Sequence, residues 1–292
     1  MASVLGRLKS AYWWLNDVSG NSLEVLREAV QRFSADRAAE AAAGLAYYAL
    51  FSLFPLLIAL VAAGSFFLER EHVYAKVIGF VTRAIPISQQ LIERNVQQVL
   101  ELRGTVGVIG VIGLLWSATG FFTVLARHIN RAWPNAKTRN FLKNRLIGIS
   151  MVGMVAVFLI LSLLATTVVS FLPQLQVPLW GGVSIYSTPL WTVLSNLVRW
   201  LLTFLMFLGL YRWVPNTEVT CSGAAWSALV AAFAWEVAAN AFTWFVTSGL
   251  VRYELVYGSL GAVIALMLWV YVSGVIVLFG AYLCAAITRC DS

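Results

Sequence analysis

Six long, continuously apolar stretches constrain the fold of this 292-residue chain more than any other feature of its sequence. Each is at least about 20 residues long, the length that a helix needs to cross roughly 30 Å of hydrocarbon. A backbone in lipid must satisfy its own hydrogen bonds, and stretches without alternating polarity exclude the strands of a membrane barrel. The sequence therefore predicts six transmembrane helices, over Leu45–Leu68, Thr105–Ala126, Leu146–Leu172, Leu194–Val214, Gly223–Val246 and Ser259–Ile287.

The charges indicate how such a bundle is oriented. Only 11% of the residues are charged, against about 25% in a soluble domain. The net charge of +7 is also unevenly distributed: Arg127–Arg145 holds six basic residues and no acid, whereas Pro173–Val193 has no Lys or Arg. By the positive-inside tendency, we expect the basic loop and both termini in the cytoplasm. We attribute the excess of positive charge to the orientation of the protein in the membrane, and we therefore expect no nucleic-acid partner.

The regions outside the spans divide the chain into parts. We expect a cytoplasmic, interfacial segment over residues 1–44, a membrane domain over residues 45–288 and a cytoplasmic tail over residues 289–292. Residues 69–104 contain two apolar stripes separated by a proline, which predicts a pair of short helices that cap the outer face. The simplest architecture is one all-α, polytopic membrane bundle with an outer helical cap.

An amphipathic helix is expected ahead of the first span, over Ser22–Arg37. Its apolar face is predicted to consist of Leu23, Leu26, Val30 and Phe33. Such a helix is either a collar packed against the inner ends of the bundle or an element that lies on the membrane surface or binds a partner. The sequence leaves both alternatives open.

Polar residues inside the predicted spans are the strongest candidates for a functional site, because each is costly in lipid and usually turned inward. Spacings of three and four residues place them on one face of each helix. The candidates are Glu236, Asn240, Thr243 and Thr247 in the fifth span and Ser195, Arg199 and Thr203 in the fourth. We expect Arg199, Glu236 and Asn240 to form a buried polar cluster that lines a cavity open to the outside. The alternative is a structural ion pair that fixes the register of two helices.

Two further features are weaker signals. Pro55 removes a hydrogen bond from the carbonyl of Phe51, so a kink is expected there, partly compensated by the hydroxyl of Ser52. The basic loop Arg127–Arg145 is suited to anionic lipid headgroups or a phosphorylated substrate, although setting the topology is explanation enough for its charge.

Metal-dependent and redox chemistry find little support in the sequence. The two histidines, His72 and His128, are expected on opposite sides of the membrane, and no HxH, DxD or HExxH pattern occurs. The cysteines all fall on the predicted cytoplasmic side, without a CxxC pattern, so we expect reduced thiols. We expect no cofactor, no metal and no catalytic residue.

Five separated sequence blocks resemble one known family in their order, spacing and residue identities. They are AAAGLAYYALFSLFPLL (Ala41–Leu57), HINRAW (His128–Trp133), YRWVPN (Tyr211–Asn216), GAAWSALVAAFAWEV (Gly223–Val237) and the segment that begins YGSLGAVIALM (from Tyr257). From about Ala38 to Ile287 the chain resembles the YihY/virulence factor BrkB family of bacterial inner-membrane proteins. Positions that the family pattern favours are Ser52, Pro55, Asn130, Pro215, Glu236, Tyr257, Gly258 and Gly261.

The resemblance implies a bacterial inner-membrane protein of about six spans, without agreed catalytic residues. Members have been labelled ribonuclease BN, linked to serum resistance or proposed to move lipids or envelope precursors. Together with the polar faces, this favours a transporter or flippase of an amphiphilic or anionic substrate. The alternative is a non-catalytic structural or assembly protein of the envelope. Because six spans enclose little space, a larger path would need a homo-oligomer.

Overall fold

The computed structural model describes residues 22–67, 119–137, 139–171, 189–248 and 260–290, and every regular element in these ranges is a helix. Besides a helical segment over residues 119–131, the elements are α2 (Ser22–Ala35), α3 (Ala38–Phe67), α7 (Phe141–Phe171), α8 (Pro189–Trp213), α9 (Cys221–Thr247) and α11 (Leu260–Cys290). The all-helical class predicted from the sequence is therefore confirmed for the described part of the chain. The predicted cap over residues 69–104 lies outside it.

The long helices overlap five of the six predicted spans. At about 1.5 Å per residue, the 25 residues of α8 already extend over more than the ~30 Å of a hydrocarbon layer. Among the described residues, three segments are long and apolar enough to cross a membrane, namely Phe141–Ser162, Cys221–Val246 and Val263–Cys290. They coincide with the third, fifth and sixth predicted spans. The first and fourth lie within α3 and α8, while only the end of the second is described, in helix 119–131.

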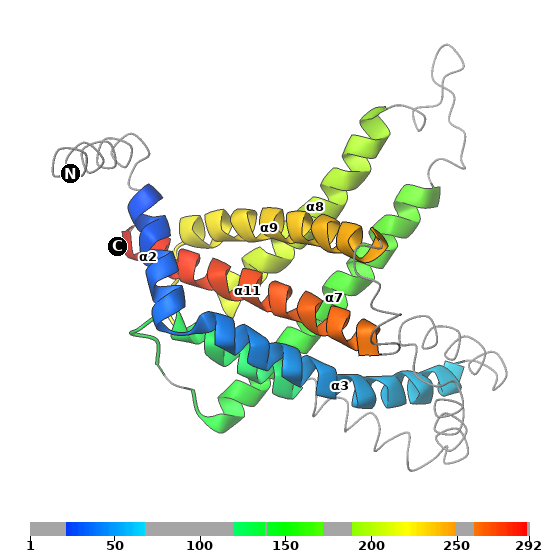
Figure 1. Cartoon of the computed structure of the whole chain (residues 1–292), viewed down its shortest axis with the longest axis horizontal. Helices are drawn as coiled ribbons and strands as arrows, with labels where there is room; N and C mark the ends of the chain where they lie inside the picture. The colour runs from blue at the N-terminus through cyan, green and yellow to red at the C-terminus, as the bar shows by residue number, and fades with distance from the viewer. Residues whose placement is uncertain (1–21, 68–118, 138, 172–188, 249–259, 291–292) are drawn as a thin grey trace.

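Helix α11 is the centre of the bundle, because it packs against α2, α3 and α9. Helix α8 contacts α9 and α7, and in Figure 1 α7 and α8 run at a steep angle to the group formed by α3, α9 and α11. Small residues permit the close contacts. Gly274 of α11 lies directly against Ala42 of α3, so that even a β-carbon at position 274 would be tightly packed.

Helix α2 packs as a collar against the end of α11. This is one of the two alternatives that the sequence left open for it. The face that it buries is nevertheless different from the predicted one: Val25 and Ala29 are buried, while Leu26 and Val30 are 45% and 50% exposed. Of the predicted stripe, Phe33 makes edge-to-face contacts with the rings of Phe279 and Tyr282. The exposed pair leaves a second apolar face available to the membrane interface.

The connection between α2 and α3 is abrupt and positions the start of the bundle. Arg37 has a φ of 51°, a left-handed conformation that is uncommon for a residue with a β-carbon. Its N–H donates to the carbonyl of Ser34, which closes the last turn of α2. Helix α3 then begins at Ala38, several residues before the predicted boundary at residue 45.

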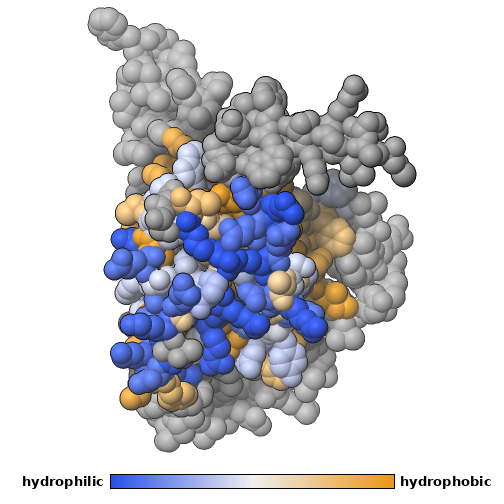
Figure 2. All heavy atoms as spheres, turned by 90° about the vertical axis from the view of Figure 1, so that its left-hand side faces the viewer, coloured by the Kyte–Doolittle hydropathy of each residue, from blue (hydrophilic) through white to orange (hydrophobic). Residues whose placement is uncertain are grey.

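One end of the bundle is strongly hydrophilic and is called the polar end below. It consists of α2, residues 127–140, residues 214–220 and the last turns of α11, and Figure 2 shows the broad hydrophilic surface on that side. An ion pair joins two of its parts: Glu28 of α2 lies 3.1 Å from Arg289 of α11, and it also pairs with Arg32 of its own helix at 3.0 Å. Charge is thus concentrated where the apolar helices end.

Candidate functional site

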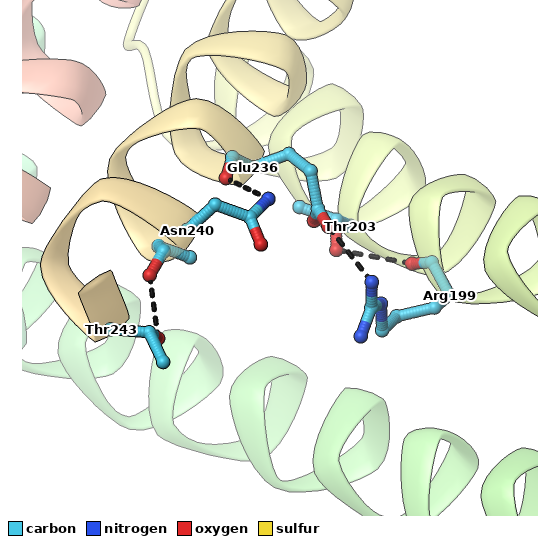
Figure 3. A network of polar contacts seen from close by, with 6 residues as sticks. Arg199, Thr203, Glu236, Asn240 and Thr243 are labelled. Atoms are coloured by element: carbon cyan, nitrogen blue, oxygen red, sulfur yellow. Dashed lines mark hydrogen bonds and ion pairs between the residues drawn. The ribbon is translucent and has the colours of Figure 1, made fainter. Parts of the chain in front are cut away.

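An ion pair joins the two predicted polar faces. The Nη2 atom of Arg199 in α8 lies 2.8 Å from Oε1 of Glu236 in α9, as Figure 3 shows. Within the described parts of the five long helices, these are the only charged residues away from a helix end. The fold brings the two residues together. Helices α8 and α9 are joined in the chain by the short segment 214–220, and they pack against each other.

The ion pair is not buried within the chain, which corrects the expectation of a buried cluster. The side chain of Arg199 is 63% exposed and that of Glu236 is 33% exposed. Glu236 lies inside a segment long and apolar enough to cross a membrane. Helices α8 and α9 diverge in Figure 1, and Figure 3 shows the side chains of Arg199 and Glu236 extending toward each other from the two helices.

The neighbouring polar side chains bond to the backbone of their own helices. Asn240 donates its amide to the carbonyl of Glu236 at 2.8 Å, and Thr243 donates its hydroxyl to that of Ala239 at 2.8 Å. On α8, Thr203 donates to the carbonyl of Arg199 at 3.1 Å. Asn240 and Thr243 remain exposed. These residues therefore satisfy their donors locally and extend the polar surface beside the ion pair, without bonding to the guanidinium.

Other predicted residues on these faces are only partly described. The backbone of Ser195 lies in α8 and that of Thr247 in α9, and their side chains lie outside the described part of the structure. In α3 the hydroxyl of Ser52 donates to the carbonyl of Ala49 at 2.7 Å, and so does not compensate the carbonyl of Phe51. The helix continues past Pro55 to Phe67, with the proline side chain outside the described residues.

Two of the positions favoured by the family pattern meet at the polar end. Asn130 accepts a hydrogen bond through Oδ1 from the backbone N–H of Asn216, at 2.8 Å, directly after the buried Pro215. Asn216 in turn donates its amide to the carbonyl of Lys137 at 2.9 Å. This pair of asparagines fastens the basic loop to the α8–α9 connection. Gly261 is buried at the start of α11, and Tyr257 and Gly258 lie outside the described residues.

The same loop borders a pocket that sequence reasoning did not anticipate. Its volume is about 370 Å³, and its lining includes Arg127, His128, Arg131 and Trp133. Burial lowers the pKa of His128 below its usual value, and the charges of Arg131 and Arg127 lower it further. The imidazole is therefore neutral near pH 7. The advance signals were the six basic residues of the loop Arg127–Arg145, noted above as suited to anionic groups, and the spacing of Arg127 and Arg131 by four residues on one helix face.

Hydrogen bonds between distant segments were also missed. Tyr282 of α11 donates to Asp36 at 2.8 Å, and Arg131 lies 3.7 Å from the other oxygen of that carboxylate. One carboxylate thus connects α2, the basic loop and α11. Among the described residues, no three His, Cys, Asp or Glu side chains are grouped so as to hold a metal ion.

Long apolar helices, a charged end and an ion pair between two helices that is set away from their ends define a multi-helix membrane protein. A family model described as virulence factor BrkB matches residues 29–292, and the chain belongs to this family. This confirms the resemblance found in the sequence.

Similar proteins have names that refer mostly to the membrane. A UPF0761 membrane protein of Vibrio vulnificus is 29% identical over 270 residues, covering 90% of this chain and 82% of the relative. The ribonuclease-like protein YfkH of Bacillus subtilis is 26% identical over 272 residues, covering 88% and 93%. A UPF0761 membrane protein of Alteromonas mediterranea is 29% identical over 278 residues, covering 95% and 91%. No solved structure shows a significant match.

Proposed function

We propose that this chain is a six-span protein of the bacterial inner membrane, with cytoplasmic termini, that transports or flips an amphiphilic, anionic substrate along the polar faces of α8 and α9. Membrane lipids and lipid-like envelope precursors are substrates of this class. The observation that carries the proposal is the ion pair between Arg199 and Glu236. The side chain of Arg199 is 63% exposed, on a helix pair otherwise free of charge away from its ends.

The ion pair suits a site that exchanges partners. An unpaired charge in the middle of a membrane helix is costly, and pairing with Glu236 removes most of that cost while no substrate is bound. Arginine binds carboxylates and phosphates by the same forked geometry. An anionic group that arrives from the exposed side can therefore replace the carboxylate of Glu236, with the amide of Asn240 and the hydroxyl of Thr203 beside it.

Apolar side chains beside the ion pair suit the other half of an amphiphile. On α9, Phe233 and Val237 lie three residues before and one residue after Glu236 and are 65% and 53% exposed. A polar surface with apolar side chains next to it is what a lipid needs if its headgroup is to cross the bilayer while its chains stay in hydrocarbon. A purely structural ion pair would gain most from being sealed between the helices, and this one is open on one side.

A flipping assay on purified protein in liposomes tests the proposal. The vesicles contain a trace of phosphatidylglycerol with a fluorescent headgroup, and a membrane-impermeant reductant measures the fraction that reaches the outer leaflet over time. Wild-type protein is compared with Glu236→Gln, Arg199→Gln and the matched control Glu218→Gln. Glu218 is an exposed carboxylate in the connection between α8 and α9, so the control makes the same chemical change away from the ion pair.

We expect faster exchange with wild-type protein than with empty vesicles, a loss of about tenfold or more in Glu236→Gln and Arg199→Gln, and no change in Glu218→Gln, since one charged hydrogen bond is worth roughly that factor. Equal rates in protein-containing and empty vesicles would reject flipping of this substrate. A fast wild type with an equally fast Glu236→Gln would place the path elsewhere. Co-purification of a stable partner without any flux would favour the assembly role.

A further inference from the structure

The pocket at the polar end has the composition of a binding site for an anion. It lies where helix 119–131 ends, and its volume of about 370 Å³ is within the usual range for sites that hold small ligands. Its lining consists of Arg127, His128, Asn130, Arg131, Trp133, Pro134 and Ala136. None of these residues is acidic, and none belongs to the polar faces of α8 and α9.

Trp133 forms an enclosed part of this lining. Its side chain is almost fully buried, with only 7% of the residue exposed. Its indole N–H has no hydrogen-bond acceptor in the described part of the chain and is itself shielded from solvent. The ring therefore gives the pocket an aromatic wall, and its indole signal can report on what occupies the pocket.

Two arginines supply positive charge that the protein itself neutralises only weakly. Arg127 is exposed and forms no ion pair with a described residue. Arg131 is 59% exposed, and its nearest carboxylate is Asp36 at 3.7 Å, which also accepts the hydroxyl of Tyr282. Basic residues at the end of a helix stabilise its carbonyl terminus. That effect accounts for the sign of the charge, but not for the pocket between the two side chains.

The walls of the pocket are fixed before any ligand arrives. Ile129 and Ala132 are fully buried and anchor the turn in the bundle core. The hydrogen bonds from Asn216 to Asn130 and to the carbonyl of Lys137 fasten the turn on its other side. A site that is already ordered loses little entropy on binding. The fold thus sets the backbone positions from which the two arginines extend.

The depth of the pocket points to a lipid rather than to a soluble phosphate. Helix 119–131 packs against the start of α7, with Gly148 against the carbonyl of Thr119 and the hydroxyl of Thr123 3.4 Å from the carbonyl of Asn144. The same register places Arg127 level with residue 140, just before Phe141 and Leu142. These two side chains are 72% and 74% exposed. The pocket therefore adjoins an apolar surface that acyl chains can cover.

We propose that this pocket binds the phosphate of an anionic phospholipid from the adjoining leaflet, with Arg127 and Arg131 paired to its oxygens beside the ring of Trp133. The site is independent of the proposed transport path, and binding there can be measured whether or not the protein moves any substrate. It would hold one lipid in place at the end of helix 119–131.

A titration of the full-length protein in neutral detergent micelles tests the assignment. The indole ¹⁵N–¹H signal of Trp133, assigned by its loss in Trp133→Phe, is followed while short-chain phosphatidylglycerol is added. Short-chain phosphatidylcholine and glycerol 3-phosphate are added in separate arms. The variant Arg127→Gln/Arg131→Gln is compared with Lys137→Gln/Lys143→Gln, which removes the same charge from exposed residues of the same loop that do not line the pocket.

We expect a saturable shift of the Trp133 signal with phosphatidylglycerol. In the double arginine variant the affinity should fall by at least about tenfold, because hydrogen bonds between charged groups and phosphate are stronger than those between neutral groups. The double lysine variant should differ from wild type by less than about twofold. An equal loss in both variants would show diffuse attraction to the loop and overturn the site. Equal affinity for glycerol 3-phosphate would overturn the lipid assignment, and equal affinity for phosphatidylcholine would overturn selection for a net negative headgroup. The absence of any saturable shift would reject the pocket.

Discussion

The hydroxyl group of Tyr211 occupies the space that a β-carbon on Gly280 would need. Tyr211 is fully buried in α8 and donates a hydrogen bond to the carbonyl of Val277 on α11, at 3.1 Å. Helix α8 therefore reaches the central helix over a glycine, and the absence of a side chain at position 280 permits the only described hydrogen bond between these two helices.

Replacement of Gly280 by alanine should destabilise the bundle. The added methyl group collides with a ring that is packed on all sides, and overpacking of this kind costs about 1–3 kcal/mol. Thermal unfolding in detergent, followed by size-exclusion chromatography, measures the change. The control is Gly153→Ala on α7, where a β-carbon meets nothing within 4 Å, and which should unfold at the same temperature or slightly higher. Equal stability of the two variants would contradict the packing described here.

The ion pair between Arg199 and Glu236 should behave as a unit. Removal of one partner leaves a charge in a membrane helix, and such a charge costs about 2.5–3.5 kcal/mol on insertion scales. We expect Arg199→Leu and Glu236→Leu each to lower the unfolding temperature, and the double variant to recover part of the loss. Thermal unfolding of the four proteins gives the coupling energy. Additive losses would show that the two side chains do not depend on each other.

Asp36 should hold the collar helix on the bundle. Its carboxylate accepts from Tyr282 and lies near Arg131, so Asp36→Asn weakens two contacts of α2, by about 1–2 kcal/mol. Hydrogen–deuterium exchange should then rise in residues 22–35 and change little in α9. Glu40→Gln is the matched control, because Glu40 pairs with Arg37 at 3.7 Å on a highly exposed surface, where ion pairs contribute little. Unchanged exchange in Asp36→Asn would refute the bridging role.

The titration of His128 should report its surroundings. Its pKa is lowered by burial and by Arg131 and Arg127, so the unfolded chain takes up a proton first as the pH falls. The contribution of this residue to stability is therefore present above about pH 6.5 and is lost as the pH falls through the folded pKa. NMR of the imidazole should give a pKa below 6.5. In Arg127→Gln/Arg131→Gln the pKa should rise only part of the way, since burial remains. A wild-type pKa at or above 6.5 would be inconsistent with this environment.

The free cysteines provide a test of the proposed orientation. Cys221 and Cys290 are exposed and Cys284 is buried. With the polar end in the cytoplasm, a membrane-impermeant maleimide should label Cys221 and Cys290 in inside-out vesicles and not in intact spheroplasts. Cys284 should react only after denaturation. Single-cysteine variants analysed by mass spectrometry separate the sites. Labelling of Cys221 in intact spheroplasts would reverse the topology.

The candidate site was predictable in part. Helical spacing was enough to group Glu236 with Asn240 and Thr243, and a short connection was enough to predict contact between α8 and α9. The pairing of Arg199 with Glu236 followed from these two facts. Its exposure did not, because exposure depends on how far α8 and α9 diverge, and no local pattern encodes that angle. The pocket beside Trp133 was missed although its lining lies within residues 127–136, because the turn that shapes it is held by hydrogen bonds from Asn216, which is distant in the sequence.

The sequence by itself determined that this chain forms long apolar helices with charge at their ends, because hydrocarbon imposes the same length and polarity on every segment that enters it. The tertiary structure decided which faces those helices bury. On α2 it selected Val25 and Ala29 over Leu26 and Val30, and at Gly280 it brought Tyr211 against α11. Lipid solvates all apolar faces alike, so only the fit of one helix against another can distinguish them.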